Sequence, residues 1–152
     1  MKLDATDKKL LALLQQNSRR TNKELSLKLN LSVTAIFERI KKLERVGVIK
    51  HYVAIVDRQK VALDFMVFCY VKLTQHSQQQ ITQFEAEVAK LDEVLECFHV
   101  SGEYDYVLKV VVADMQSFRT FMVNKLTSLQ HIGSTQSAFT INEVKNTTAI
   151  TI

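Results

Sequence analysis

The chain has 152 residues, of which 47% are hydrophobic, and carries a formal net charge of +4. This composition excludes a disordered chain and allows one domain or two small ones. No apolar run reaches the ~20 residues that a membrane-spanning helix requires, and the start, MKLDATDKKL, lacks the apolar core of a signal peptide. We therefore expect a cytoplasmic protein in which the isolated Cys69 and Cys97 are reduced thiols.

The charge is divided unevenly along the chain. Residues 1–60 hold 14 Lys and Arg against 6 Asp and Glu, a net of +8, whereas residues 61–152 hold 6 against 10, a net of −4. A basic half joined to an acidic half indicates that only the first half meets a polyanion such as double-stranded DNA.

The first 31 residues predict two helices and a turn. Asp4 is the expected N-cap of the first helix, and Leu10, Leu11 and Leu14 give its buried stripe. Thr21 and Glu24 have the spacing of a capping box that starts a short second helix. Asn30 can adopt the left-handed conformation that ends it. A tight turn then leads to a third helix, which is the helix-turn-helix arrangement.

The third helix is expected over SVTAIFERIKKLER, with Ser32 as N-cap and with Val33, Ile36, Ile40 and Leu43 as its buried stripe. The opposite face is small, hydroxylated and basic, as a helix that enters a major groove requires. The residues expected to contact base edges are Thr34, Ala35, Glu38 and Arg39. The remaining expected DNA-contact positions are the basic residues Arg19, Arg20, Lys23, Lys41, Lys42 and Arg45, for phosphates, together with Ser32.

A β-rich segment, VIKHYVAIV, follows at residues 48–56. It predicts a strand that forms a wing or pairs with a partner chain. The polar stretch from 57 to 64 predicts a connector. We place the division there, with a DNA-binding domain at 1–60 and a second domain at 61–152.

The second domain alternates strands and helices. Strands are predicted at 66–73, 94–100, 106–113 and 135–144, with helices that begin after Ser77 and Asp114. The order β-α-β-β-α-β is that of a ferredoxin-like domain, so the fold class is α+β. Because the first strand is apolar on both faces, a second copy is expected to cover the sheet face that the helices leave open, as a homodimer.

The loop between the two middle strands is the candidate effector site. Gly102 lets backbone N–H groups approach an anion, and an acidic side chain beside them would hold the ammonium of a free amino acid. The candidate acids are Glu103, Asp105 and Asp114. The alternative is a tight hairpin with solvated acids, in which Asp114 only caps a helix.

Nothing in the sequence has the pattern of an enzyme, a cofactor loop or a metal site. Cys97 and His99 share a strand face, but two ligands do not make a zinc site. We expect neither a catalytic residue nor a metal or cofactor.

Three segments of the chain resemble the Lrp/AsnC (leucine-responsive and asparagine-C) family of prokaryotic transcription regulators. They are LDATDKKLLALLQ, NKELSLKLNLSVTAIFERIKKLERVGVI and CFHVSGEYDYVLKVVVADM, and their spacing matches as well. The resemblance implies a winged or ribbon-extended helix-turn-helix domain and a C-terminal effector domain. It also implies dimers that assemble into octamers or hexadecamers and respond to a small molecule, usually an amino acid.

The resemblance also implies an effector site made by the whole loop with help from the last strand and a neighbouring dimer. Its residues are Ser101, Gly102, Glu103, Tyr104, Asp105, Asp114, Gln136 and Thr140. One departure concerns base preference: Phe37 and Glu38 stand where family members often carry arginines. Glu38 can accept from cytosine or pair with a nearby lysine. An architectural DNA-coating protein and a regulator without an effector remain the alternatives.

Overall fold

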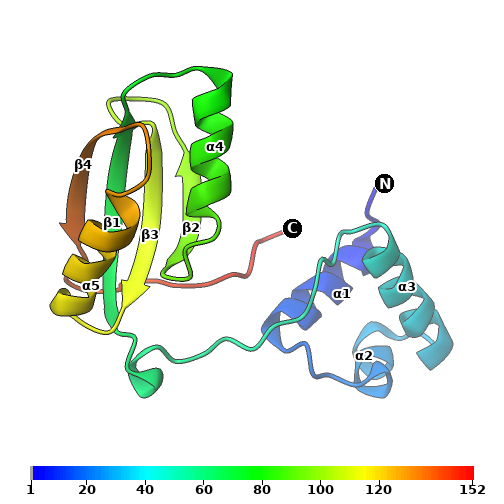
Figure 1. Ribbon diagram of the computed structural model, residues 1–152. Helices are drawn as coiled ribbons and strands as arrows, with labels where there is room; N and C mark the ends of the chain where they lie inside the picture. The colour runs from blue at the N-terminus through cyan, green and yellow to red at the C-terminus, as the bar shows by residue number, and fades with distance from the viewer. Residues whose placement is uncertain (1) are drawn as a thin grey trace. The chain divides into compact units, whose positions relative to one another are not determined.

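The structure is a computed structural model that describes residues 2–152. The chain forms two compact units (Figure 1): one runs to Ile55 and includes Val144–Ile152, and the other is Val56–Glu143. Among the described residues, every helix is too short or too polar to cross a bilayer.

The first unit is a three-helix domain with α1 (Ala5–Gln16), α2 (Asn22–Leu29) and α3 (Val33–Arg45). The predicted caps are confirmed. The N–H of Asp7 donates to Asp4 (2.7 Å), that of Glu24 to Thr21 (3.2 Å), and that of Ala35 to Ser32 (3.1 Å). Asn30 ends α2 at φ 54°, so the tight turn before α3 is built as expected.

Leucines from all three helices make the core of this unit. Its buried members are Leu10, Leu11, Leu14, Leu25, Ile36 and Leu43. The expectation that Val33 is buried was wrong, because its side chain is 47% exposed at the first position of α3.

Residues 48–56 have no regular secondary structure within one chain, so the expected strand does not form there as a wing; its pairing with a partner chain stays a prediction. A strand needs a neighbouring strand to pair its N–H and C=O groups, and this unit has no other strand among its described residues. The segment instead borders a groove of about 650 Å3, together with α1 and the C-terminal tail. The side chain of Gln15 holds the tail by accepting from the N–H of Ile150 (2.8 Å) and donating to its C=O (2.9 Å).

The second unit is a four-stranded antiparallel sheet with helices on one face. Its elements are β1 (Phe65–Leu73), α4 (Gln78–Val88), β2 (Val94–His99), β3 (Tyr106–Val112), α5 (Met115–Phe121) and β4 (Ile132–Phe139). A short 3-10 turn, Gln59–Val61, precedes them, and α5 continues as the π-helix Met122–Leu126. The strand order β2-β3-β1-β4 is the ferredoxin-like order, as predicted. The last strand begins and ends earlier than expected, because the chain leaves the sheet after Phe139.

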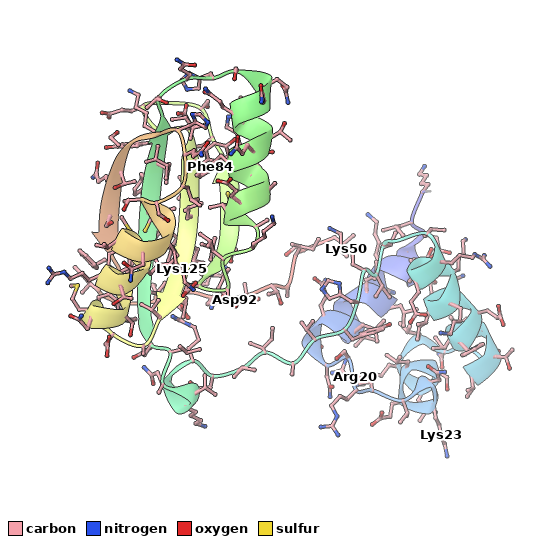
Figure 2. All side chains as sticks on the ribbon, viewed as in Figure 1. Arg20, Lys23, Lys50, Phe84, Asp92 and Lys125 are labelled. Atoms are coloured by element: carbon pink, nitrogen blue, oxygen red, sulfur yellow. The ribbon has the colours of Figure 1, made fainter. Side chains whose placement is uncertain are left out.

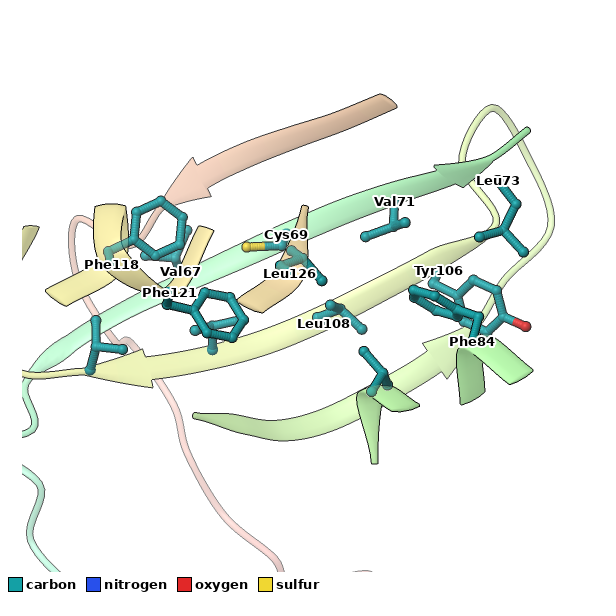
Figure 3. Packing of buried hydrophobic residues seen from close by; sticks show 13 residues of the cluster. Val67, Cys69, Val71, Leu73, Phe84, Tyr106, Leu108, Phe118, Phe121 and Leu126 are labelled. Atoms are coloured by element: carbon teal, nitrogen blue, oxygen red, sulfur yellow. The ribbon is translucent and has the colours of Figure 1, made fainter. Parts of the chain in front are cut away.

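The helices cover the face of the sheet formed by alternate residues of β1 and β3 (Figure 3). Phe84 of α4 lies against Tyr106, with ring centroids 4.7 Å apart. Phe118 and Phe121 of α5 fill the other end of this core. Each helix thus closes one half of the same face and leaves the opposite face uncovered by any described element of this unit.

Candidate nucleic-acid interface and ligand site

The outward face of α3 carries most of the residues expected to contact DNA. Thr34, Glu38, Lys42 and Arg45 are exposed, while Ala35 is half-buried beside the core residue Ile36. α3 follows the tight turn after α2 and packs its other face, with Ile36 and Leu43, into the core, so the outward side chains remain open to solvent. The arrangement can place a basic, hydroxyl-bearing helix in a major groove.

Arg39 forms ion pairs with two acidic side chains, although helical spacing alone places it on the exposed face of α3. Its Nη1 lies 2.7 Å from Oδ2 of Asp4 and 2.6 Å from Oδ1 of Asp7, both at the start of α1. The Asp7 side chain is only 4% exposed, against 31% for that of Arg39. An N–H of the Asp7 backbone and the Arg39 guanidinium hold the pKa of Asp4 below its ordinary value, and the two carboxylates raise the pKa of Arg39. Arg39 therefore fastens α3 to α1.

Two apolar side chains, Val33 and Phe37, lie on the exposed face of α3, although helical spacing predicts that Val33 is buried. Phe37 is 44% exposed and lies one turn after Val33, so the two side chains are neighbours on α3. Nζ of Lys41 lies 5.9 Å from the centroid of the Phe37 ring and 2.9 Å from Oε2 of Glu44. An exposed aromatic residue four positions before a lysine was the signal available in the sequence.

The residues expected to contact phosphates occupy several elements. Lys23, at the start of α2, points away from the unit (Figure 2), and Arg19 is exposed in the turn before α2. Arg20 differs, because its guanidinium donates to the C=O of Leu13 (3.0 Å) and so also closes the end of α1. Ser32 uses its hydroxyl as the cap of α3.

The loop from Ser101 to Asp105 joins β2 to β3 and contains a constrained backbone. Gly102 has φ +135°, a conformation that other residues rarely adopt, and nothing lies within 4 Å of a Cβ added there. The hydroxyl of Tyr104 donates to the amide oxygen of Gln136 on β4 (2.7 Å), and its ring lies 5.6 Å from that of Tyr70. The loop is thereby joined to the last strand.

Asp105 is engaged by its own unit. Its carboxylate accepts from the N–H of Leu73 (2.8 Å) and lies 2.8 Å from Nε2 of His76. Burial alone would raise the pKa of Asp105, but these hydrogen bonds outweigh it and lower the pKa. Glu103 is exposed. Asp105 therefore holds the loop in place, whereas the Glu103 carboxylate faces solvent.

Two of the expected ligand residues lie at the other end of the sheet. Asp114 follows the end of β3, about 23 Å from the loop at ~3.3 Å per residue. Its carboxylate accepts from the N–H of Ser117 (2.7 Å), which makes it the N-cap of α5. The N–H of Thr140 donates to the C=O of Met66, beyond the end of β4. Within one chain these residues and the loop do not form a single site.

Both cysteines are free thiols. Burial raises the pKa of Cys69 to about 11, and partial desolvation together with the nearby Glu85 carboxylate raises that of Cys97, which is exposed at the surface, to about 11 as well. Among residues 2–152, no group of three His, Cys, Asp or Glu side chains is placed to hold a metal ion.

Two family models match the chain. Residues 3–50 match a winged helix-turn-helix DNA-binding domain, and residues 66–150 match the Lrp/AsnC ligand binding domain. The DNA-binding transcriptional activator DecR of Escherichia coli is 35% identical over 99% of both chains. The leucine-responsive regulatory protein of Escherichia coli is 35% identical over 99% of this chain and 92% of its own.

Solved structures agree with these relatives. A transcriptional regulator of Neisseria meningitidis, in complex with L-Met, superimposes with a TM-score of 0.93 at 37% identity, covering 98% of this chain and 96% of its own. An AsnC family regulator of Agrobacterium tumefaciens gives a TM-score of 0.93 at 34% identity, with 97% and 96% covered. These relatives are regulators of transcription and not enzymes. The chain belongs to the Lrp/AsnC family of DNA-binding transcription regulators.

Proposed function

We propose that this regulator reads its binding site with the exposed face of α3 in the major groove. The observation that supports this most is the freedom of that face: Thr34 and Glu38 stand exposed over its first half, and Lys42 and Arg45 over its second. Hydroxyl and carboxylate groups can bond to base edges, whereas the basic side chains meet phosphates. Ala35 is half-buried beside Thr34, so it lies at the margin of the contact. In this proposal Arg39 positions α3, because its guanidinium binds Asp4 and Asp7 at the start of α1.

The phosphate contacts fall around this face. Lys41, Lys42 and Arg45 continue along α3, and Ser32 is at its start. Arg19, Arg20 and Lys23 supply contacts from the turn before α2 and from its first residues. Such contacts give affinity to any duplex and make it depend on salt.

Footprinting on promoter DNA separates this function from that of an architectural protein. A regulator protects discrete sites at concentrations that leave the rest of the duplex open to cleavage. Uniform protection, with the same affinity for scrambled sequences, would indicate a protein that coats DNA and would contradict sequence-specific reading.

The ligand that we propose is a free amino acid. Support comes from the Neisseria meningitidis regulator, which was solved with L-Met and is similar over nearly the whole chain. In this chain, the backbone N–H groups around Gly102 can bind the carboxylate, and Glu103 can bind the ammonium. Tyr104 and Gln136 form one wall of the site. Ser101 begins the loop, and Asp105 fixes its end.

Asp114 and Thr140 can join this site only from another copy of the chain, because they lie at the far end of the sheet. A ligand held between copies would link amino-acid binding to assembly, which is the mechanism of regulation we propose.

Calorimetry with each of the twenty amino acids tests the ligand. We expect heat with at least one of them, and the Gly102→Ala variant should weaken that binding by about tenfold or more, because φ +135° strains any side chain. The matched control is Gly47→Ala, also at positive φ with open space around it, but in the DNA-binding unit. Absence of heat with every amino acid would instead favour a regulator without an effector.

We further propose that the chain forms a homodimer through the sheet face that α4 and α5 leave open. Phe68 and Tyr70 are half-buried on that face, and Phe98 is 53% exposed. Residues 48–56 supply a second contact, because they carry β-favouring side chains and lack a partner strand. If residues 48–56 of two chains pair with each other, each segment becomes a β-strand, which it is not in a single chain.

A charge placed on the open sheet face should break the dimer. Phe98→Asp would bury a carboxylate in an apolar contact, which costs several kcal/mol. Light scattering should therefore show a smaller mass than that of the wild-type assembly. Val123→Asp is the matched control, since Val123 is exposed on the helical side of the unit. Loss of mass in both variants, or in neither, would contradict this interface.

We also propose that four such dimers assemble into an octamer. The proposed location of the protein is the cytoplasm, where the DNA is. The functional division into residues 1–60 and 61–152 remains a prediction.

A further inference from the structure

The exposed apolar pair on α3 has no role in the unit's own packing. Val33 is 47% exposed and Phe37 is 44% exposed, and neither belongs to the core that Ile36, Ile40 and Leu43 form with the other helices. They stand one above the other on the helix, four residues apart. We call these two side chains the apolar patch.

Polar and basic groups surround the apolar patch. Thr34 and Glu38 lie beside it along the helix, and Lys41 places its ammonium over the Phe37 ring, 5.9 Å from the centroid. Lys42 and Arg45 continue the basic surface toward the end of α3. A basic rim around an apolar centre complements a duplex groove, in which phosphates flank the base edges.

The major groove contains one apolar group that a side chain can recognise, the 5-methyl group of thymine. A phenylalanine or valine in contact with this methyl distinguishes thymine from cytosine without a hydrogen bond. Resting on the proposed placement of α3 in the major groove, we infer that the apolar patch is a thymine-reading subsite in which Phe37 contacts the 5-methyl group. Phe37 is then a specificity-determining residue, and Val33 extends the same contact toward the start of the helix.

Replacement of thymine by deoxyuridine tests this contact, because it removes the methyl group and leaves the hydrogen-bonding groups unchanged. A duplex is first selected from a random library with the wild-type full-length chain, and each thymine is then replaced in turn. At one or more positions the wild-type affinity should fall about fourfold, the value expected for one buried methyl group. Phe37→Ala should bind the selected duplex more weakly and should bind the thymine and deoxyuridine forms equally.

Two variants control for loss of folding or of surface area. Phe37→Leu keeps an apolar side chain and should retain the preference for thymine, and Leu27→Ala removes an exposed apolar side chain from α2 and should behave as wild type. Circular dichroism checks that Phe37→Ala stays folded.

The possible results separate the subsite from the function that it rests on. If no sequence is enriched, the reading of DNA by α3 fails and the subsite fails with it. If a sequence is enriched but deoxyuridine is tolerated at every position, or if Phe37→Ala still prefers thymine, only the subsite is refuted. If Phe37→Ala instead changes the oligomeric mass and leaves base preference unchanged, the patch is a contact between copies and the inference is wrong.

Discussion

Replacing Arg39 with alanine should weaken sequence-specific DNA binding by about tenfold or more and should lower the free energy of unfolding of the DNA-binding unit by about 2 kcal/mol. The reason is the position of Asp7, whose carboxylate is nearly buried and receives its shortest contact from Arg39 (2.6 Å). Without the guanidinium this nearly buried carboxylate loses its ion-pair partner. The contact that fixes α3 against α1 is lost at the same time.

Asp7→Asn separates a positioning role for Arg39 from direct contact with DNA. This variant leaves the charge of Arg39 intact and makes the protein more positive, so simple electrostatics favours tighter binding to DNA. If Arg39 positions α3, Asp7→Asn should nevertheless weaken binding to the selected duplex, as Arg39→Ala does. Fluorescence anisotropy and thermal melts measure both effects. Tighter specific binding by Asp7→Asn, together with a smaller salt slope for Arg39→Ala, would show that Arg39 contacts DNA itself.

Two core variants should disable the two units separately. Phe84→Ala removes a fully buried ring that contacts Tyr106 at 4.7 Å, and Leu43→Ala removes a fully buried side chain from the core of the DNA-binding unit. Such changes cost about 3–5 kcal/mol for phenylalanine and about 2–5 kcal/mol for leucine. Phe84→Ala should therefore abolish amino-acid heat and assembly, and Leu43→Ala should abolish DNA binding while both other properties remain.

Scanning calorimetry follows the same two variants directly. Because the described residues form two separate hydrophobic clusters, we expect two transitions, each lowered in temperature by one variant. Leu27→Ala, the same chemical change at an exposed position of α2, should leave both transitions in place. A single transition that both variants lower equally would mean that the two units unfold together and would contradict their independent unfolding.

Features set by local sequence could be predicted well. The caps Asp4, Thr21 and Ser32 accept hydrogen bonds from residues three positions later in the chain. Four consecutive residues are therefore enough to predict each cap. The order of elements in the second unit, and from it the ferredoxin-like sheet, followed from periodicity and chain order in the same way.

Features that depend on distant partners could not be predicted. The strand expected at residues 48–56 has the right side chains, but no strand in its own unit pairs with it. Arg39 faces outward by helical spacing alone, and only the packing of α3 against α1 brings it to Asp4 and Asp7, 35 and 32 residues earlier in the chain. Asp114 is a different case, because the strand predicted at 106–113 already separates it from the loop. Thr140 reaches the same end of the sheet only because β4 pairs antiparallel with β1.

The measurement that tests the central claim most directly is the ratio of dissociation constants for a scrambled and a selected duplex. It compares wild type with the double variant Thr34→Ala/Glu38→Ala and with Thr82→Ala/Glu87→Ala, the same residue types on α4. If the exposed face of α3 reads the bases, the first variant should lose about tenfold or more of this ratio, at 1–3 kcal/mol per lost base contact, and the second should keep it. A ratio unchanged by the α3 variant, or lost equally in the α4 variant, would contradict reading by α3.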